Sequence, residues 1–283
     1  MHQTQSFVNV TRWMIVLLII SPLSVAWAES PALDRKDYLQ AALRHALPGL
    51  QITHMSEHEV VPGWMQLDVK TQKGQKVVYA DLTGRYVLVG SIFDLNTGQN
   101  LTRERLVKQR EKLFDAFEGS MAIMVQRDAS DTEPPSAPRP LLYFTDPDCP
   151  YCQQFQPEFQ KLIDAGYPVA VLLFPSARLH PDAPRKAASI WCAGDQLAAL
   201  ESAFRRDEVA DPDASCPAPP LKEVRELAQA FGITGTPSLV LPGGEVIRGF
   251  QRAEGILTWL ERTNRPEHPP RSLPVSDEGR NTP

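Results

Sequence analysis

Cys149 and Cys152 are the residues of this 283-residue chain whose spacing predicts chemistry most directly. The apolar run at residues 141–144 before them is typical of a short buried strand. Residues 153–165 after them have helical spacing, with Phe155, Phe159 and Leu162 on one side. This order places Cys149 at a helix N-terminus, where unpaired N–H groups and the helix dipole stabilise a thiolate. Because thiolates attack disulfides, the pattern predicts thiol–disulfide exchange.

The two cysteines are predicted to have different roles in that exchange. Cys149 is the outermost residue of the turn and should be the exposed nucleophile. Cys152 lies one helical turn inward, from where it could resolve a mixed disulfide on Cys149. Pro150 suits the first helical position, because its missing N–H would be unpaired there. The N–H groups of Tyr151 and Cys152 are then the nearest donors to the Cys149 sulfur.

Half of a zinc site is the alternative interpretation of this cysteine pair. Zinc would need a second ligand pair of similarly close spacing, and the remaining cysteines, Cys192 and Cys216, are far apart. His54 and His58 are predicted to be surface residues rather than ligands. The strand-turn-helix order favours a redox motif, and no metal site is expected.

A second signal is the Thr236-Pro237 pair, which enters a hydrophobic strand at residues 238–241. Proline cannot donate a hydrogen bond to a strand ladder, so it is confined to strand starts and edges. An ordinary trans bond at a strand start is one interpretation. A cis bond, which is essentially restricted to X-Pro pairs, is the other.

Several stretches resemble the periplasmic thiol:disulfide isomerases DsbC and DsbG. They are Phe-Thr-Asp-Pro-Asp-Cys-Pro-Tyr-Cys at 144–152, Leu-Phe-Pro at 173–175, Ile-Trp-Cys at 190–192, Ala-Ser-Cys at 214–216 and Gly-Thr-Pro at 235–237. The first and last are typical of the whole thioredoxin superfamily, whereas the Trp-Cys and Ser-Cys pairs point to the DsbC branch. The resemblance extends over about residues 31–260. It implies a cis Thr236-Pro237 bond beside the active cysteines, with the Thr236 backbone free to pair with an extended substrate strand.

The chain departs from the family pattern at two positions. Pro150 gives the Cys-Pro-Tyr-Cys form found in DsbG, where DsbC carries a glycine, so the balance between isomerase and reductase stays open. Tyr143 stands six residues before Cys149, where thioredoxin itself places a buried aspartate. A proton relay would therefore use water, or Asp146 and Asp148 in the loop.

Cys192 and Cys216 could form a second redox pair or a permanent structural disulfide. Neither lies in a Cys-x-x-Cys motif or beside a helix start, so the structural disulfide is predicted. Closing a loop of about 25 residues would stabilise the fold by roughly 3 kcal/mol in the chain-entropy account.

The N-terminus predicts export, and the resemblance implies the periplasm as the destination. Arg12 precedes an apolar run at residues 13–20, and Ala26-Trp27-Ala28 supplies a small-residue cleavage site, so residues 1–28 are predicted to be a signal peptide. An uncleaved anchor is the alternative, but the run is shorter than the roughly 20 apolar residues that a spanning helix needs. Export places all four cysteines where disulfides form and persist. The net charge of −5 argues against nucleic acid as a partner.

We expect an α+β fold that consists of a small N-terminal cystatin-like dimerisation domain, a linker helix and a C-terminal thioredoxin-like domain with a helical insertion. The expected divisions are 29–100 for the dimerisation domain, 101–120 for the linker, 121–263 for the catalytic domain and 264–283 for a disordered tail.

Hydrophobic periodicity predicts the elements inside these divisions. The N-terminal domain would have a helix capped by Asp34 and strands at 50–55, 65–69, 76–80 and 86–95. A solvated linker helix would span 103–118. The insertion would be helical at 187–204 and 221–231.

The resemblance implies that Cys149 attacks wrong disulfides in exported proteins and that Cys152 resolves the mixed disulfide. Thr236 and Pro237 would hold the substrate strand, next to Pro150 and Tyr151. The implied partners are misfolded exported proteins, a second copy of the chain in a homodimer, and a membrane electron donor of the DsbD type. No cofactor is implied. Two alternatives stay open: a DsbG-like reductase of single oxidised cysteines with few clients, and a holdase chaperone without essential thiol chemistry.

Overall fold

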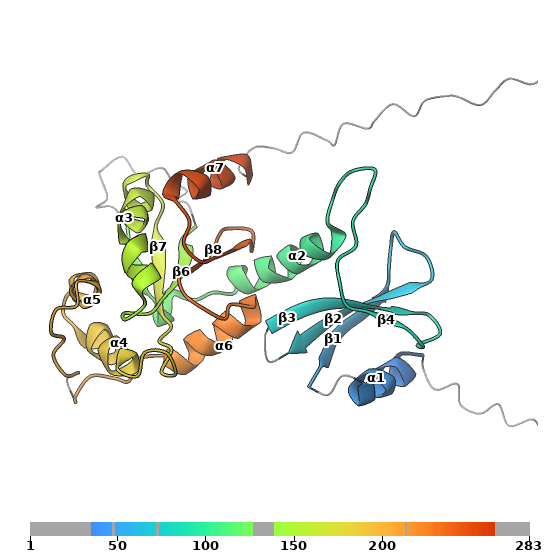
Figure 1. Cartoon of the computed structure of the whole chain (residues 1–283), viewed down its shortest axis with the longest axis horizontal. Helices are drawn as coiled ribbons and strands as arrows, with labels where there is room; N and C mark the ends of the chain where they lie inside the picture. Colours follow the sequence, from blue (N-terminus) through green and yellow to red (C-terminus); the bar gives the residue numbers. More distant parts are fainter. Residues whose placement is uncertain (1–34, 47–48, 72–73, 127–138, 213, 264–283) are drawn as a thin grey trace, which may run out of the picture.

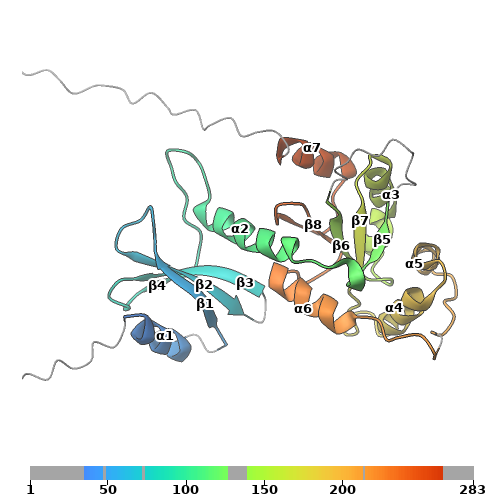
Figure 2. The same cartoon turned by 180° about the vertical axis from the view of Figure 1, so that it is seen from behind.

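The chain folds into two α+β units joined by a helix, and the computed structural model describes residues 35–46, 49–71, 74–126, 139–212 and 214–263 of it (Figure 1). The first unit has a four-stranded sheet and the second a five-stranded sheet. Helix α2 runs between the units in both views (Figures 1 and 2). The expected α+β fold class is confirmed. The predicted signal peptide, the predicted tail and most of the loop before β6 lie outside the described residues.

The N-terminal unit is an antiparallel sheet that packs against one helix, α1 (Arg35–Ala46). Alternate positions of its central strands carry apolar residues that meet the apolar side of the helix. The strands, in spatial and chain order, are β1 (Gln51–Glu57), β2 (Trp64–Thr71), β3 (Gly74–Asp81) and β4 (Val87–Leu88). The core consists of Leu39, Leu43, Leu67, Val69, Val78 and Ala80.

The prediction of a strand over residues 86–95 is wrong for most of its length. Only Val87–Leu88 pairs with β3, and the chain then leaves the sheet. Its backbone finds partners at the start of α2 instead: Ile92 N–H donates to Thr102 Oγ1 at 2.9 Å, and Leu101 N–H donates to Ile92 O at 3.0 Å. Apolar alternation alone does not reveal whether a neighbouring ladder exists, so it overestimated the strand.

Helix α2 (Leu101–Asp115) is anchored to both units, which corrects the expectation of a solvated linker. The Asn100 side chain caps its N-terminus by accepting a hydrogen bond from Arg103 N–H at 2.9 Å. Arg105 makes a two-point ion pair with Asp68 of β2, at 3.2 and 2.6 Å. Phe114 is buried in the core of the second unit. The helix is therefore a packed bridge.

The two units also touch directly at a pair of glycines. Gly74 begins β3 with a φ of +103°, and Gly232 follows α6 (Leu221–Phe231) with a φ of 72°. A Cβ on Gly74 would lie 2.4 Å from the Gly232 Cα, much closer than a real contact. Glycine at position 74 therefore permits both the backbone conformation and the close approach of β3 to α6.

The second unit is built on a mixed sheet with the strand order β5-β7-β6-β8-β9. The central pair, β6 and β7, is parallel and completely buried, because helices cover both faces of the sheet. Successive residues of β6 face opposite sides, so Tyr143 joins the core beneath α3 and Phe144 joins the core beneath α6. The strands are β5 (Ile123–Val125, after a 3-10 turn at Gly119–Met121), β6 (Leu141–Thr145), β7 (Val169–Leu173), β8 (Ser238–Val240) and β9 (Val246–Arg248).

Helices complete this unit. α3 (Pro150–Asp164) follows β6, and α7 (Ala253–Thr263) packs against it. The helix predicted over 187–204 is in fact two, α4 (Ala183–Cys192) and α5 (Gln196–Phe204), because Asp195 caps a new helix by accepting a hydrogen bond from Ala198 N–H at 2.9 Å. None of the helices in the described part of the chain is both long enough and apolar enough to span a membrane.

Candidate active site

Cys149 lies between β6 and α3, at the N-cap of the helix. Pro150 occupies the first helical turn, as predicted. The turn is held by two backbone hydrogen bonds, from Cys149 N–H to Asp146 O at 3.1 Å and from Cys152 N–H to Cys149 O at 3.0 Å. The N–H groups of Tyr151 and Cys152 also contribute hydrogen bonds to the Cys149 sulfur. The sequence thus folds locally into an anion-favouring helix start.

Both cysteines are free thiols, and both are largely covered. Cys149 is 6% exposed and Cys152 is 0% exposed. The prediction of an exposed Cys149 is therefore wrong, although Cys149 is the less buried of the two. The cover comes from the loop before β8, where the Thr236 carbonyl accepts a hydrogen bond from the Cys149 thiol at 3.5 Å. This contact covers the sulfur on the side of the loop.

The surroundings of Cys149 lower its pKa from an ordinary 9.0 to about 5. The hydrogen bond from the Cys152 thiol makes the largest contribution, and burial opposes it. Hydrogen bonds from the Thr236 side chain and from the first-turn N–H groups lower the pKa further. The Thr236 carbonyl favours the protonated thiol, since a carbonyl only accepts, but the donors prevail. The thiolate is therefore the stable form of Cys149 at neutral pH.

Cys152 has the opposite electrostatic environment. Burial raises the pKa of the Cys152 thiol most strongly, and its hydrogen bond to Cys149 and the Cys149 charge raise it further. The Thr145 side chain and the Asp146 N–H lower it. The proton of the pair therefore resides on Cys152, and the negative charge resides on Cys149.

The Thr236–Pro237 bond is cis, as predicted, and the loop that contains it lies over Cys149. Pro237 is buried directly before β8, and the Ser238 hydroxyl fixes the loop by donating to Gly235 O at 2.8 Å. The structure brings Cys149, Cys152, Thr236 and Pro237 together, with Pro150 and the 59% exposed Tyr151 at the rim.

Asp146 has a role that sequence analysis missed. Its side chain is fully buried and accepts hydrogen bonds from Asp148 N–H at 2.9 Å and Ser176 N–H at 2.8 Å. His180 Nδ1 lies 2.9 Å from the same carboxylate. Asp146 therefore ties the Cys149 loop to the loop after β7. Ser176 and His180 are 30 and 34 residues downstream, so local sequence gave no sign of this contact.

Two known families match consecutive segments of the chain. Residues 25–103 match the disulfide bond isomerase protein N-terminal domain, and residues 126–264 match a thioredoxin-like domain. The thiol:disulfide interchange protein DsbC of Dickeya dadantii is 28% identical over 225 residues, which are 78% of this chain and 86% of the relative. DsbC of Escherichia coli K12 is 27% identical over 187 residues, 65% of this chain and 73% of the relative.

A solved structure of a disulfide interchange protein from Neisseria gonorrhoeae is 30% identical to this chain. The match covers 52% of this chain and 97% of that protein, with a TM-score of 0.41. On the two family matches and the DsbC relatives, the chain belongs to the DsbC/DsbG family. Its N-terminal family match contains α1 and β1 to β4, and the thioredoxin-like match contains β6 to α7 with Cys149, Cys152 and the cis loop.

The other two cysteines of this DsbC/DsbG-family chain are joined in a disulfide. Cys192 ends α4, and Cys216 lies in the segment before α6, at a sequence separation of 24. The bridge therefore encloses α5 and ties the helical insertion to the chain that leads into α6. Its permanence during catalysis stays a prediction.

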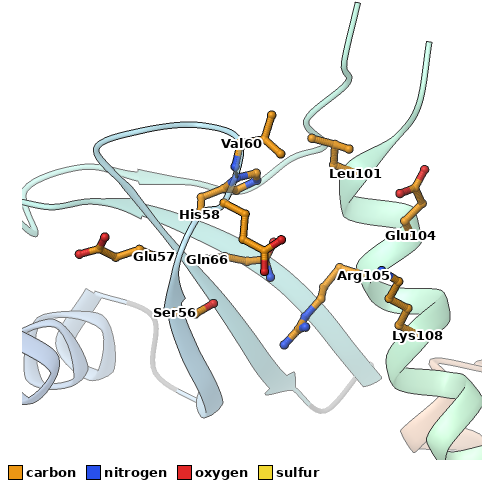
Figure 3. Close-up of a pocket in the computed structure, with 10 residues that line it drawn as sticks. Ser56, Glu57, His58, Val60, Gln66, Leu101, Glu104, Arg105 and Lys108 are labelled. Atoms are coloured by element: carbon orange, nitrogen blue, oxygen red, sulfur yellow. Dashed lines mark hydrogen bonds between the residues drawn. The ribbon is translucent and has the colours of Figure 1, made fainter. Parts of the chain in front are cut away.

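A pocket lies away from the cysteines, between the β1–β2 turn and α2 (Figure 3). The prediction of a surface His58 is wrong, since His58 is 8% exposed and its ring packs against Tyr79 with centroids 5.5 Å apart. Burial lowers the pKa of His58. Side chains of both charge signs, including Glu104 and Lys108 of α2, line the pocket (Figure 3). Across the described ranges, no group of three or more His, Cys, Asp or Glu residues could hold a metal ion.

Proposed function

We propose that this protein is a thiol:disulfide isomerase that repairs wrong disulfides in exported proteins. The Cys149 thiolate attacks one sulfur of a substrate disulfide, which forms a mixed disulfide and releases the other substrate sulfur as a thiolate. A substrate thiolate can then attack the mixed disulfide, form a new substrate disulfide and regenerate Cys149. This cycle transfers no net electrons and needs no cofactor.

The same site can also reduce a substrate. If Cys152 attacks the mixed disulfide first, the Cys149–Cys152 disulfide forms and the substrate leaves as a dithiol with two additional electrons. An electron donor must then reduce the pair, and family resemblance points to a membrane protein of the DsbD type. The competition between Cys152 and the substrate thiolate decides between reduction and isomerisation.

The observation that carries this proposal is the asymmetry of the two thiols. Cys149 has a pKa lowered to about 5 and lies under a loop with a cis peptide bond, whereas Cys152 is buried with a raised pKa. A stable thiolate beside a protonated partner suits a nucleophile and a resolving thiol. Thr236 and Pro237 would bind the substrate strand, with Pro150 and Tyr151 at the rim.

A homodimer formed through residues 29–100 is part of this proposal. The edge strand β4 and the loop after it expose apolar side chains that have no cover within the described chain. The 101–120 linker and the 121–263 catalytic domain would then place two active sites around one substrate. The exposed apolar residues are Tyr86, Val87, Leu88, Val89, Phe93 and Leu95.

Export to the periplasm through a signal peptide at residues 1–28 completes the proposal. Family membership and the disulfide between Cys192 and Cys216 support an oxidising compartment.

The test is the recovery of activity by an exported protein whose disulfides have been scrambled. We expect the wild-type chain to restore native pairing, Cys149→Ala to be inactive, and Cys152→Ala to retain part of the isomerase activity. A DsbG-like reductase would instead need both cysteines and would release reduced substrate. A holdase chaperone would keep its activity in Cys149→Ala, which would contradict the proposal.

A further inference from the structure

Besides the Cys149 thiol and the Asp146 N–H, two hydroxyls interact with the Cys152 sulfur. Tyr143 of β6 lies in the same buried core as Cys152, and its side chain is 0% exposed. The Tyr143 hydroxyl lies within hydrogen-bonding reach of the Cys152 thiol, and so does the Thr145 side chain. The two hydroxyls also contact each other, since Thr145 Oγ1 donates to the Tyr143 oxygen at 3.1 Å. That bond uses the single Thr145 proton and occupies the Tyr143 oxygen as an acceptor, so in this arrangement the Tyr143 proton is the one available to the sulfur.

Packing holds the Tyr143 ring in this position. Its centroid lies 5.2 Å from that of Phe155 and 5.6 Å from that of Phe159, both on α3, the helix that carries Cys152. All three rings are buried, so the hydroxyl has little freedom to leave the sulfur. A preorganised donor stabilises a developing charge without the cost of reorientation.

The carboxylates that sequence analysis considered for a proton relay are bound elsewhere. The Asp146 carboxylate faces Ser176, His180 and the Asp148 N–H, and Asp148 pairs with Lys186 at 2.5 Å. These carboxylates therefore serve to hold the loop. The Tyr143–Thr145 pair occupies the place beneath the buried thiol.

We propose that Tyr143, held by Thr145, is a catalytic hydrogen-bond donor that stabilises the Cys152 thiolate when Cys152 attacks the mixed disulfide on Cys149. In that step the bond between Cys149 and the substrate sulfur breaks, and a bond between Cys149 and Cys152 forms. The substrate sulfur leaves with the electron pair and takes up the proton that Cys152 gave to solvent. Tyr143 keeps its own proton throughout, which agrees with a pKa that burial raises well above the ordinary tyrosine range.

This role rests on the proposed function. Through it, the Tyr143 and Thr145 hydroxyls would determine how long the mixed disulfide lasts before Cys152 resolves it. Burial disfavours the Cys152 thiolate, so its rate of attack depends on the few donors near the sulfur. A slower attack leaves more time for a substrate thiolate to rearrange the disulfide. Removal of the Tyr143 hydroxyl should therefore shift the products from reduction towards isomerisation.

The test uses the reduced full-length chain and a small aromatic disulfide whose thiol product is coloured. The first equivalent of thiol is released when Cys149 attacks, and the second is released when Cys152 resolves the mixed disulfide. The variants are Tyr143→Phe, which keeps the packed ring, and Thr145→Val, which keeps the shape of the side chain. Tyr79→Phe is the matched control, because Tyr79 is also buried and bonded to a threonine hydroxyl, Thr102 at 2.5 Å, but lies in the N-terminal unit.

In Tyr143→Phe we expect the second phase of thiol release to be roughly 10-fold slower or more than in the wild-type chain. The pH midpoint of its rate should move upwards, and the rate of the first phase should be unchanged. Thr145→Val should slow the second phase in the same direction, and Tyr79→Phe should change neither phase. The inference would be overturned if folded Tyr143→Phe released the second thiol with the wild-type rate and pH midpoint. If Tyr143→Phe does not fold, the same result in Thr145→Val would overturn it. Absence of the first phase in the wild-type chain would instead contradict the proposed function itself.

Discussion

The low pKa of Cys149 depends most on its neighbour Cys152, and this dependence can be measured. With a pKa of about 5 instead of 9.0, Cys149 is almost completely a thiolate at neutral pH. An unperturbed thiol would be about 1% ionised under the same conditions. Replacing Cys152 by alanine removes the largest contribution to this shift, the hydrogen bond from the Cys152 thiol. A hydrogen bond to a charged group contributes roughly 1.5–3 kcal/mol, which corresponds to about 1–2 pKa units.

The assay is the rate of iodoacetamide labelling of the reduced chain as a function of pH, with the modified cysteine located by mass spectrometry. Alkylation follows the thiolate, so the rate for Cys149 should be half-maximal near pH 5 and should fall as the pH drops below that value. In Cys152→Ala the midpoint should move up by about 1–2 units, because loss of a donor destabilises the thiolate. Cys152→Ser keeps a donor at the same place and should show a smaller shift. A wild-type midpoint near 9, equal midpoints in all three proteins, or preferential labelling of Cys152 would refute this reasoning.

Three further predictions follow from the fold. Deletion of residues 29–100 should give a monomer that reduces small disulfides but does not rescue scrambled proteins, because one site alone cannot retain a misfolded chain; equal isomerase activity of the truncated chain would contradict this. Replacement of both Cys192 and Cys216 by alanine should lower the free energy of unfolding by roughly 3 kcal/mol in a denaturant titration and leave the alkylation midpoint of Cys149 unchanged. Gly74→Ala should lower the midpoint temperature of thermal unfolding more than Gly166→Ala does. Both glycines have positive φ, but of the two only the Cβ at position 74 would meet another backbone, at 2.4 Å. Equal decreases in the two midpoint temperatures would show that the contact between β3 and α6 is unimportant.

The parts of the fold that local sequence determines were predictable. The helix start at Cys149 and Pro150 needs only a strand, a turn and a helical pattern. A proline at a strand start left the Thr236–Pro237 bond open between cis and trans, and the family resemblance implied the cis bond that the structure has. The strand predicted at 86–95 failed because its backbone partners come from the start of α2 rather than from a sheet neighbour. The single helix predicted at 187–204 failed because a cap at Asp195 outweighs continuous apolar spacing.

The sequence predicted the two cysteines of the site, but it did not predict the groups that cover them or form hydrogen bonds with them. The degree to which Cys149 is covered depends on Thr236, which is 87 residues away in the chain. The contacts of Asp146 with Ser176 and His180 likewise depend on the pairing of β7 with β6, which brings the two loops together. In the sequence, Tyr143 was identified only as the residue that replaces the aspartate of thioredoxin. Nothing in the local sequence shows that its hydroxyl would reach Cys152.

The most direct measurement of the central claim is covalent capture of a substrate. The full-length Cys152→Ser variant, incubated with an exported protein that carries scrambled disulfides, cannot resolve a mixed disulfide by its second thiol. Mass mapping of the trapped complex should find a disulfide between Cys149 and a substrate cysteine, with the Cys192–Cys216 bridge intact. A crosslink through Cys192 or Cys216, or a complex held together without any covalent bond, would contradict the assignment of Cys149 as the nucleophile of a disulfide isomerase.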